Sequence, residues 1–218
     1  MGLLARTVGT KLDVQRLGTV PYGDAWVLQT ALHERRCRGD IGDTLLLLEH
    51  PHVYTIGRRG SATDVLWDAE TLRSRGVDVV ETDRGGQVTY HGPGQLVGYP
   101  IVDLGPRNDL VGHVRKLEDV LIGTLGHFGL KAARDEGNTG VWVAGAKIAA
   151  IGVRVTRGVT KHGFALNVAP DLRYFAGIVP CGIFDKGVTS MAHEMDEAPS
   201  IDRVADVVAA ACAEVSWR

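Results

Sequence analysis

A glycine-rich stretch at residues 84–98 constrains the fold of this chain more than any other feature. Five of its fifteen residues are glycine, and an arginine, a histidine and two glutamines lie among them. Glycine weakens a strand unless something must approach the main chain closely or φ must be positive. Short β-type runs at 87–90 and 95–101 flank a compact turn at 91–94. We therefore expect a surface on which a ligand lies flat against main chain; a glycine-rich hairpin without a ligand is the alternative.

The same stretch has the spacing of a dinucleotide-binding loop but not its context. Gly92, Gly94 and Gly98 form a G-x-G-x-x-x-G pattern. The dinucleotide fingerprint requires a helix to begin at its glycines. Here Tyr99 and Pro100 follow, and a proline favours extended conformation in the residue before it. The sequence therefore argues against a nucleotide loop.

The composition is that of an ordinary globular protein. The 218 residues include 24 basic and 26 acidic side chains, a net charge of −2, and 44% hydrophobic residues. There is no basic surplus for nucleic acid, no apolar run near the ~20 residues that span a membrane, and no signal peptide. Three widely spaced cysteines, never in C-x-x-C, favour neither a disulfide framework nor a zinc site. We expect one domain over residues 1–218, in the cytoplasm.

Hydrophobic periodicity predicts an alternation of strands and helices. Helices are expected at 24–38 with Asp24 as N-cap, 68–75, 109–128, 171–175 and 201–217. Strands are expected at 14–17, 44–49, 53–56, 77–81, 131–134, 140–143, 147–156 and 161–168, besides the two runs above, with an exposed turn at 57–60. The fold class is therefore α/β (α+β), with mixed, largely antiparallel sheets flanked by helices.

Cys181 is the strongest candidate for a nucleophile. Pro180 and Gly182 flank it and set a sharp, fixed bend, which suits a displayed thiol better than a packed one. Cys212 lies among alanines, where a buried cysteine is usually a small apolar residue. Cys37 lies in a run of arginines and is expected to be exposed and inert. A packing role for Cys181 is the alternative.

Lys147 is the candidate partner of that thiol. A thiol has an ordinary pKa near ~8.5 and needs a nearby cation to be a good nucleophile at neutral pH. Alanine, glycine and isoleucine surround Lys147 in the chain, and none of them would solvate an ammonium group. An unremarkable surface lysine is the alternative.

Two histidines, His91 and His162, each precede a glycine and are candidates either for the site or for structural hydrogen bonds. His50 and His52 are spaced like a metal-binding pair, but no third ligand lies nearby in the sequence, so we expect no metal. No G-x-S-x-G occurs, which disfavours a serine hydrolase.

Three long motifs resemble the lipoyl(octanoyl) transferase family. In order, they read RGGQVTYHGPGQLVGYP at 84–100, KIAAIGVRV at 147–155 with KHGFALNV at 161–168, and PCGIFDKGVTS at 180–190. The string LLLLEHPHVYTIGRRG at 45–60 also fits, so the resemblance covers nearly the whole chain. It implies a fold shared with lipoate- and biotin-protein ligases.

The resemblance also implies roles for individual residues. Cys181 would be the acyl-thioester nucleophile, and Lys147 would lower its pKa and, when neutral, act as base. The implied substrate-binding residues are Arg84, Gly85, Gly86, Gln87, Val88, Thr89, Tyr90, His91, Ala150, Ile151, Gly152, Gly163, Phe164 and Ala165. We further expect the acyl chain to pass against the main chain of Gly85, Gly86 and Gly94.

The implied reaction moves an octanoyl group from octanoyl-acyl carrier protein to a lysine of lipoyl domains. The acceptors would be the lipoyl domains of 2-oxoacid dehydrogenase complexes and the H protein of glycine cleavage, in the first step of endogenous protein lipoylation. No cofactor is expected, since the donor thioester is already activated.

Two alternatives remain. A lipoate- or biotin-protein ligase would activate a free acid with ATP, but its glycine stretch usually continues from histidine to aspartate, whereas Gly92, Pro93 and Gly94 follow His91 here. A ligase also needs no cysteine nucleophile. A silent module that only binds lipoyl domains is the second alternative, and the pair of Cys181 and Lys147 argues against it.

Overall fold

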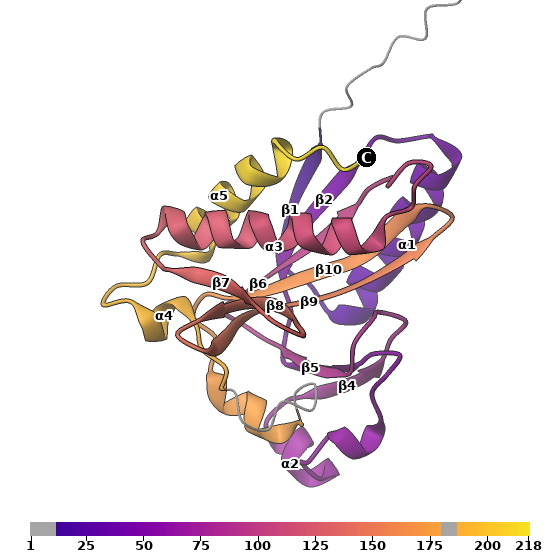
Figure 1. Ribbon diagram of the computed structural model, residues 1–218. Coiled ribbons are helices and arrows are strands. Elements are labelled where there is room, and N and C mark those ends of the chain that lie inside the picture. The colour runs from indigo at the N-terminus through magenta and orange to yellow at the C-terminus, as the bar shows by residue number, and fades with distance from the viewer. Residues whose placement is uncertain (1–11, 180–186) are drawn as a thin grey trace, which may run out of the picture.

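The computed structural model describes residues 12–179 and 187–218 (Figure 1). The strands are β1 (Asp13–Thr19), β2 (Thr44–Glu49), β3 (Val53–Ile56), β4 (Asp78–Glu81), β5 (Val88–His91), β6 (Gln95–Ile101), β7 (Ala132–Asp135), β8 (Asn138–Val143), β9 (Ala146–Thr156) and β10 (Val159–Asn167). The α-helices are α1 (Tyr22–Arg38), α2 (Ala69–Ser74), α3 (Leu110–His127), α4 (Met191–Glu194) and α5 (Ile201–Ala213). Short 3-10 helices are η1 (Ala62–Asp64) and η2 (Leu172–Gly177).

The described strands form two sheets. The larger has seven strands in the order β1-β2-β6-β10-β9-β8-β7, and its neighbours are antiparallel except for β1 and β2. The smaller has the order β4-β3-β5, with β3 parallel to β4 and antiparallel to β5. The predicted fold class, with mixed and largely antiparallel sheets, is confirmed.

Helices cover both faces of the larger sheet. In Figure 1, α3 and α5 lie on one face and α1 lies on the other. Strand β2 shows why, because its side chains alternate between the two faces. Leu45 and Leu47 pack into the core that α3 and α5 cover, whereas Leu46 and Leu48 pack toward α1. A strand buried on both faces is apolar throughout, which accounts for the continuous apolar run in the sequence.

Strands β5 and β6 enclose the glycine-rich turn, yet they belong to different sheets. Strand β5 pairs with β3 in the smaller sheet, and β6 pairs with β2 and β10 in the larger one. The hairpin alternative is therefore wrong: the turn at 92–94 carries the chain from one sheet to the other. This crossing places the polar residues before the turn beside the larger sheet.

Most element boundaries agree with the predictions, and those of β2, β3 and β6 agree fully. The prediction that Asp24 caps the first helix is wrong. Pro21 occupies the N-cap, and Asp24 lies in the first helical turn, where the helix dipole favours a negative charge. The helix ends at Arg38 as predicted, and Gly39 caps it in a left-handed conformation with φ of 79°.

The last helix is shorter than predicted, since α5 ends at Ala213 instead of residue 217. Trp217 continues the apolar pattern but lies beyond the helix. It is buried, and its ring centroid lies 5.4 Å from that of His113 on α3. Trp217 is buried in a non-helical tail at a position that also fits the helical spacing, so the sequence pattern predicted a helix that is too long.

Candidate active site

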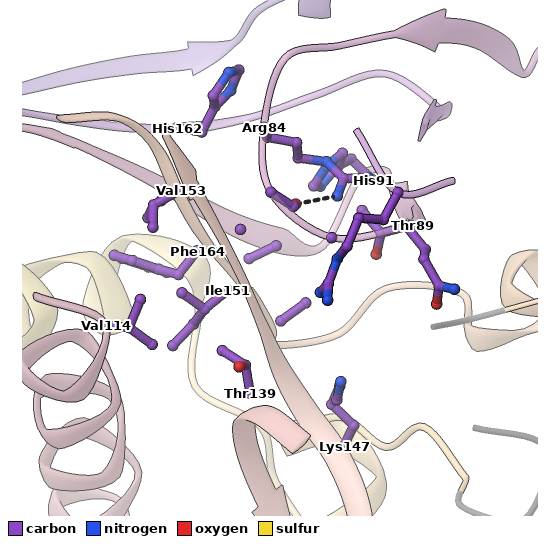
Figure 2. Close-up of a pocket in the computed structure, with 18 of the residues that line it drawn as sticks. Arg84, Thr89, His91, Val114, Thr139, Lys147, Ile151, Val153, His162 and Phe164 are labelled. Atoms are coloured by element: carbon purple, nitrogen blue, oxygen red, sulfur yellow. Dashed lines mark hydrogen bonds between the residues drawn. The ribbon is translucent and has the colours of Figure 1, made fainter. Parts of the chain in front are cut away.

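A pocket of about 550 Å³ opens between the two sheets (Figure 2). Its lining comes from residues 84–91, from strands β9 and β10, from the first turns of α3, and from residues 137–139. Residues that are distant in the chain therefore meet around a single cavity. A cavity of this size is typical of small-molecule sites.

The pocket has two unlike walls. The residues of segment 84–91 that line the pocket form what we call the polar wall, and Val114, Ile151, Val153 and Phe164 form the apolar wall. Figure 2 shows the labelled residues of the two walls on opposite sides of the pocket, with Lys147 and His162 at opposite ends. The arrangement suits a ligand with an apolar chain and a reactive polar end.

The pocket gathers nearly all of the predicted site residues that the structure describes. These are Arg84, Gly85, Gly86, Gln87, Thr89, His91, Lys147, Ala150, Ile151, Gly152, Gly163, Phe164 and Ala165. Two predicted substrate-binding residues, Val88 and Tyr90, do not line it. Residues of the first two motifs thus come together in space, and their contacts with substrate stay a prediction.

The absence of Val88 and Tyr90 from the lining follows from strand geometry. Successive side chains of a strand point to opposite faces. Thr89 and His91 face the pocket, so Val88 and Tyr90 point into the apolar cluster of the smaller sheet, where both are fully buried. A prediction made residue by residue along a motif misses this alternation.

Arg84 fixes the polar wall. It is 7% exposed, and its Nε and Nη2 donate to the Thr55 hydroxyl at 3.1 and 2.9 Å. Nη2 also donates to the Thr55 carbonyl, and Nη1 donates to the Gly85 carbonyl at 3.0 Å. The guanidinium group therefore ties the polar wall to strand β3.

Glycines let this wall lie directly on neighbouring main chain. The Gly85 N–H donates to the Val153 carbonyl at 3.1 Å. A Cβ added at Gly152 would lie 2.8 Å from the Gly85 carbonyl oxygen, and one added at Gly57 would lie 2.5 Å from that of Gly86. The sequence suggested that glycine makes room for a ligand, but at these positions it makes room for the chain itself.

Gly94 has no part in the pocket, so the expectation that an acyl chain passes against it is wrong. An added Cβ would lie 2.4 Å from the Ala169 carbonyl oxygen. The Gly94 N–H donates to the Glu49 carboxylate at 2.6 Å, and its φ is 85°. Gly94 is required for the turn between the sheets.

His91 lies at the base of the polar wall and is nearly inaccessible to solvent. Its ring is stacked near Tyr22, with centroids 6.1 Å apart, and meets His50 edge-on at 5.7 Å. Burial, and then the charges of His50 and Arg84, hold the pKa of His91 well below its ordinary value. His91 is therefore neutral at physiological pH.

His162 is held by an aspartate. Its Nε2 donates to Asp83 at 2.7 Å, and its φ of 58° is unusual for a residue within a strand. Lys161 also donates to Asp83, at 2.9 Å. Hydrogen bonds from His162 and Lys161 keep the pKa of Asp83 below its ordinary value, while burial lowers the pKa of His162. This cluster anchors the chain just before the polar wall to strand β10.

Lys147 lines the pocket from strand β9, half-buried. Its Nζ lies 4.8 Å from the ring centroid of Trp142, the residue opposite it on β8. An aromatic face attracts an ammonium group, so the surroundings are less hostile to the charge than the neighbouring sequence indicated. Lys147 also pairs through its main chain with Gly187 and Thr189.

Cys181, the predicted nucleophile, lies outside the described residues. Cys212 is fully buried, which raises the pKa of its thiol to about 12, in agreement with its predicted packing role. Cys37 is half-buried against the core beneath α1 instead of exposed, with its Sγ 3.8 Å from the His33 ring.

The histidine pair predicted not to bind metal has other partners. His50 donates through Nδ1 to the Val20 carbonyl and accepts from Tyr99 at Nε2, both at 2.7 Å. His52 lies 2.9 Å from the Tyr90 hydroxyl. In residues 12–179 and 187–218, His, Cys, Asp and Glu form no group of three that could hold a metal ion.

In the same part of the chain, no helix is long and apolar enough to cross a membrane.

Sequence reasoning missed several residues of the pocket. Tyr22, Arg59, Tyr99, Leu110, Val114 and residues 137–139 line it without belonging to any predicted site. Leu110 and Val114 lie in the helix predicted at 109–128, and no motif pointed to them. The feature that could have identified them is their place in the first turns of a helix, where apolar side chains can line an adjacent cavity.

Comparison with known proteins places the chain in a family. The model of the lipoyl protein ligase A/B catalytic domain matches residues 21–213. The chain therefore belongs to the lipoyl protein ligase A/B catalytic domain family, and the resemblance seen in the motifs is confirmed. It is 52% identical over 203 residues to an octanoyltransferase of Koribacter versatilis, covering 90% of this chain and 81% of the relative. It is also 52% identical over 206 residues to an octanoyltransferase of Mycobacterium tuberculosis, covering 93% and 86%.

A solved structure of lipoate-protein ligase A bound with ATP has the same fold. Its TM-score is 0.73 at 16% identity, over 94% of this chain and 84% of that chain. At this identity the likeness shows the fold alone. The prediction of a fold shared with lipoate-protein ligases is confirmed.

Proposed function

We propose that this chain is a lipoyl(octanoyl) transferase of the cytoplasm. It takes an octanoyl group from octanoyl-acyl carrier protein and delivers it to a lysine of lipoyl domains. The acceptors are those of 2-oxoacid dehydrogenase complexes and the glycine cleavage H protein. The observation that carries the proposal is that Lys147 and other residues of the first two motifs line one two-walled pocket, in a chain half identical to octanoyltransferases.

The apolar wall is proposed to hold the acyl chain. Phe164 and Val153 belong to the main core, and Val114 and Ile151 pack against it, so the wall is the open edge of that core. Burying the methylenes of an octanoyl chain at about 0.8 kcal/mol each stabilises binding by roughly 5 kcal/mol, an upper value. This burial favours an acyl chain over a polar ligand and leaves the reactive carbonyl at the end of the pocket where Lys147 lies.

The chemistry is proposed to proceed in two acyl transfers. In the first, the Cys181 thiolate, stabilised by the Lys147 ammonium, attacks the donor thioester; the carrier thiolate is expelled and takes the proton of the ammonium, which leaves Lys147 neutral. In the second, the amine of the acceptor lysine attacks the octanoyl thioester on Cys181. Neutral Lys147 takes the proton from that amine, an amide forms, and the Cys181 thiolate is released.

The donor supplies the activation in this scheme, so the enzyme needs neither ATP nor a metal. A ligase with the same fold would form no stable acyl-cysteine and would require ATP to use a free acid. The two functions therefore separate in a single reaction mixture.

Incubation with octanoyl-acyl carrier protein, without ATP, tests the proposal. Intact mass should increase by one octanoyl group, which peptide mapping should locate at Cys181. Addition of an apo lipoyl domain should then transfer the group to its lysine. The matched controls are Cys181→Ala, which should acquire no acyl group, and Cys212→Ala, which should react normally. Acylation at Cys37 or Cys212, or transfer only with ATP and free octanoate, would contradict the proposal.

A further inference from the structure

A row of buried polar side chains leads from the polar wall to Thr189. The His91 Nδ1 lies 2.8 Å from the Gln95 Oε1. Gln95 donates through Nε2 to the Asn167 Oδ1 at 2.9 Å, and Asn167 donates through Nδ2 to the Thr189 carbonyl at 2.9 Å. All four residues are at most 6% exposed. We call this row the amide chain.

The register of the larger sheet explains why these side chains meet. Gln95 on β6 is paired directly with Asn167 on β10. Directly opposed residues of antiparallel strands have their Cβ atoms about 5 Å apart, which is within reach of two amides. His91 ends β5 of the smaller sheet, so the amide chain also joins the two sheets.

Main-chain carbonyls fix the direction of the hydrogen bonds, because a carbonyl can only accept. Gln95 Nε2 lies 3.2 Å from the Tyr90 carbonyl, so it is the donor, and its Oε1 is left to accept from His91. In the same way, the Thr189 carbonyl makes Nδ2 of Asn167 the donor. His91 must therefore carry its proton on Nδ1, and every bond runs from His91 toward Thr189.

The other end of His91 agrees with this direction. Its Nε2 lies 3.4 Å from the hydroxyl of Thr55. That hydroxyl already accepts from Arg84, so its own proton is available to the unprotonated Nε2. The bonds thus continue in one sense from the polar wall, through His91, into the amide chain.

The amide chain ends at the residues that hold Lys147. The Lys147 N–H donates to the Gly187 carbonyl, and the Thr189 N–H donates to the Lys147 carbonyl, each at 2.9 Å. Thr189 therefore bonds to Lys147 through its N–H and to Asn167 through its carbonyl. The side chain of Asn167 adds a contact from this segment to β10, beside the main-chain bonds that the segment makes with β9.

We propose that Asn167 is a positioning residue for Lys147, acting through Thr189 and oriented in turn by Gln95 and His91. The functional part of this inference rests on the proposed role of Lys147. The amide chain keeps the lysine at a fixed place relative to the polar wall, although the two lie on different sheets. Lys147 is thereby set for the proton transfer, and the polar wall for the acyl group, by one set of hydrogen bonds.

The amide chain lies next to apolar residues of β6 and β10. Leu96, Val97 and Leu166, which adjoin the amide chain on the same two strands, are all fully buried and apolar. Buried amides are costly unless each is hydrogen-bonded, and apolar residues would fill the space without that requirement. A requirement for position, beyond simple packing, accounts for their presence.

The test uses Asn167→Asp in the full-length protein. This change keeps the size and the acceptor for Gln95 but replaces the donor to Thr189 with an oxygen that repels its carbonyl. The matched control is Val208→Ala, which opens a cavity in the apolar core under α5 and destabilises the fold elsewhere. Two readouts, hydrogen exchange and histidine NMR, need no acyl donor; steady-state transfer is the third.

Asn167→Asp should speed amide exchange at Lys147 and Thr189 by tenfold or more relative to the rest of β9. It should lower kcat of transfer by tenfold or more, with KM for the donor changed less than twofold. Val208→Ala should speed exchange broadly and leave kcat unchanged. In the wild-type protein, ¹⁵N NMR of the imidazole should show His91 as the Nδ1–H tautomer.

Unchanged local exchange in Asn167→Asp, or an Nε2–H tautomer of His91, would overturn the amide chain itself. Fast local exchange with unchanged kcat would overturn the positioning role. If the wild-type protein transfers no octanoyl group, the proposed function fails, and the exchange and NMR results still decide whether the chain holds Lys147.

Discussion

The two walls of the pocket are held in place by different forces. The polar wall carries the donors of Arg84, main-chain contacts that only glycine allows, and a histidine whose hydrogen bonds run in a fixed direction. The apolar wall has Phe164 and Val153 in the main core, with Val114 and Ile151 packed at its edge. Hydrogen bonds fix positions sharply, whereas packing adapts to changes of volume at a graded cost. We therefore expect substitutions in the polar wall to reduce activity sharply. Substitutions in the apolar wall should change the preference for acyl chain length in small, graded steps.

The largest effect on activity is expected from substitution of Lys147, which lies at one end of the pocket. Lys147→Ala removes both the charge and the base, and should lower kcat by about 10²–10⁴-fold, the range of acid–base catalysis. Lys147→Arg keeps the charge but cannot deprotonate, so it should form acyl-enzyme and then stall before transfer. Rapid-quench measurement of acyl-enzyme formation and decay separates the two steps. Lys131→Ala, at an exposed lysine, is the control.

Lys147→Ala should also shift alkylation of Cys181 to higher pH, because a thiol without its cation keeps its proton. An unmoved alkylation profile would remove Lys147 as the partner of the thiol. His91 would then be a poor substitute, since its protonation is strongly disfavoured by burial.

The next effect is on the pH dependence of stability. It concerns the polar side of the pocket, because the apolar wall contains no ionisable group. Burial lowers the pKa of His50, which lies behind the polar wall, to about 4. Between pH 6.5 and 4 the unfolded state binds the proton and the folded state does not, so stability falls as pH falls. A shift of this size corresponds to about 3 kcal/mol at most for one histidine.

Urea unfolding at pH 7 and at pH 4.5 measures this effect. His50→Asn, which keeps a donor for the Val20 carbonyl, should reduce the loss of stability on acidification. Part of the loss should remain, since burial also lowers the pKa of His113 to about 4. A pH dependence identical in His50→Asn and wild type would show that His50 is accessible to protons in the folded state.

A smaller effect is expected when the polar wall is displaced without loss of a functional group. Gly152→Ala places a Cβ 2.8 Å from the Gly85 carbonyl oxygen, so the wall must move away. A displacement of this kind should lower kcat/KM by about tenfold or more, since catalysis is sensitive to shifts near 1 Å. Steady-state kinetics on folded protein checks this.

The control for that change is Gly123→Ala, at an exposed glycine of α3 that has no atom within 4 Å of an added Cβ. It should stabilise the protein by about 0.5–1 kcal/mol, because glycine is unfavourable inside a helix, and leave activity unchanged. Full activity of Gly152→Ala would mean that the polar wall is compliant, and the contrast between the walls would fail.

The smallest effect is a graded one on the apolar wall. Val114→Ala should extend the pocket and raise the preference for decanoyl over octanoyl donors, and Val114→Phe should favour shorter chains. Each buried methylene contributes about 0.8 kcal/mol, which corresponds to about fourfold in kcat/KM. Competition between donors of different length measures the ratio directly. Val111→Ala, on the same helix but with the valine 70% exposed, should not alter it.

Much of the fold was accessible from local patterns. The apolar run predicted the strand at 44–49, and hydrophobic periodicity predicted the helix at 109–128 to within one residue at each end. What local patterns could not provide was the partner of each strand. The glycine-rich turn looked like a hairpin because its flanking strands are adjacent in the chain, and pairing with β3 on one side and β10 on the other separates them.

The candidate site was predictable as a set of motifs but not as a geometry. Arg84, Lys147 and Gly163 were found from their neighbours in the sequence, and they do line one pocket. The role of Gly94 was misjudged because its neighbour, Ala169, is distant in the chain. The sequence could not predict the tautomer of His91 either, since the tautomer depends on carbonyls that only the folded chain brings together.

The contact between Gly85 and Val153 has a consequence for the order of folding. The polar wall cannot form its main-chain contact with Val153 until β9 has been synthesised and has joined the larger sheet. Contacts between distant segments form late, because closing a long loop costs entropy before any contact repays it. The protein should therefore acquire its capacity to bind an acyl chain only after β9 has joined the larger sheet. A nascent or partly folded chain would then be unable to capture a substrate.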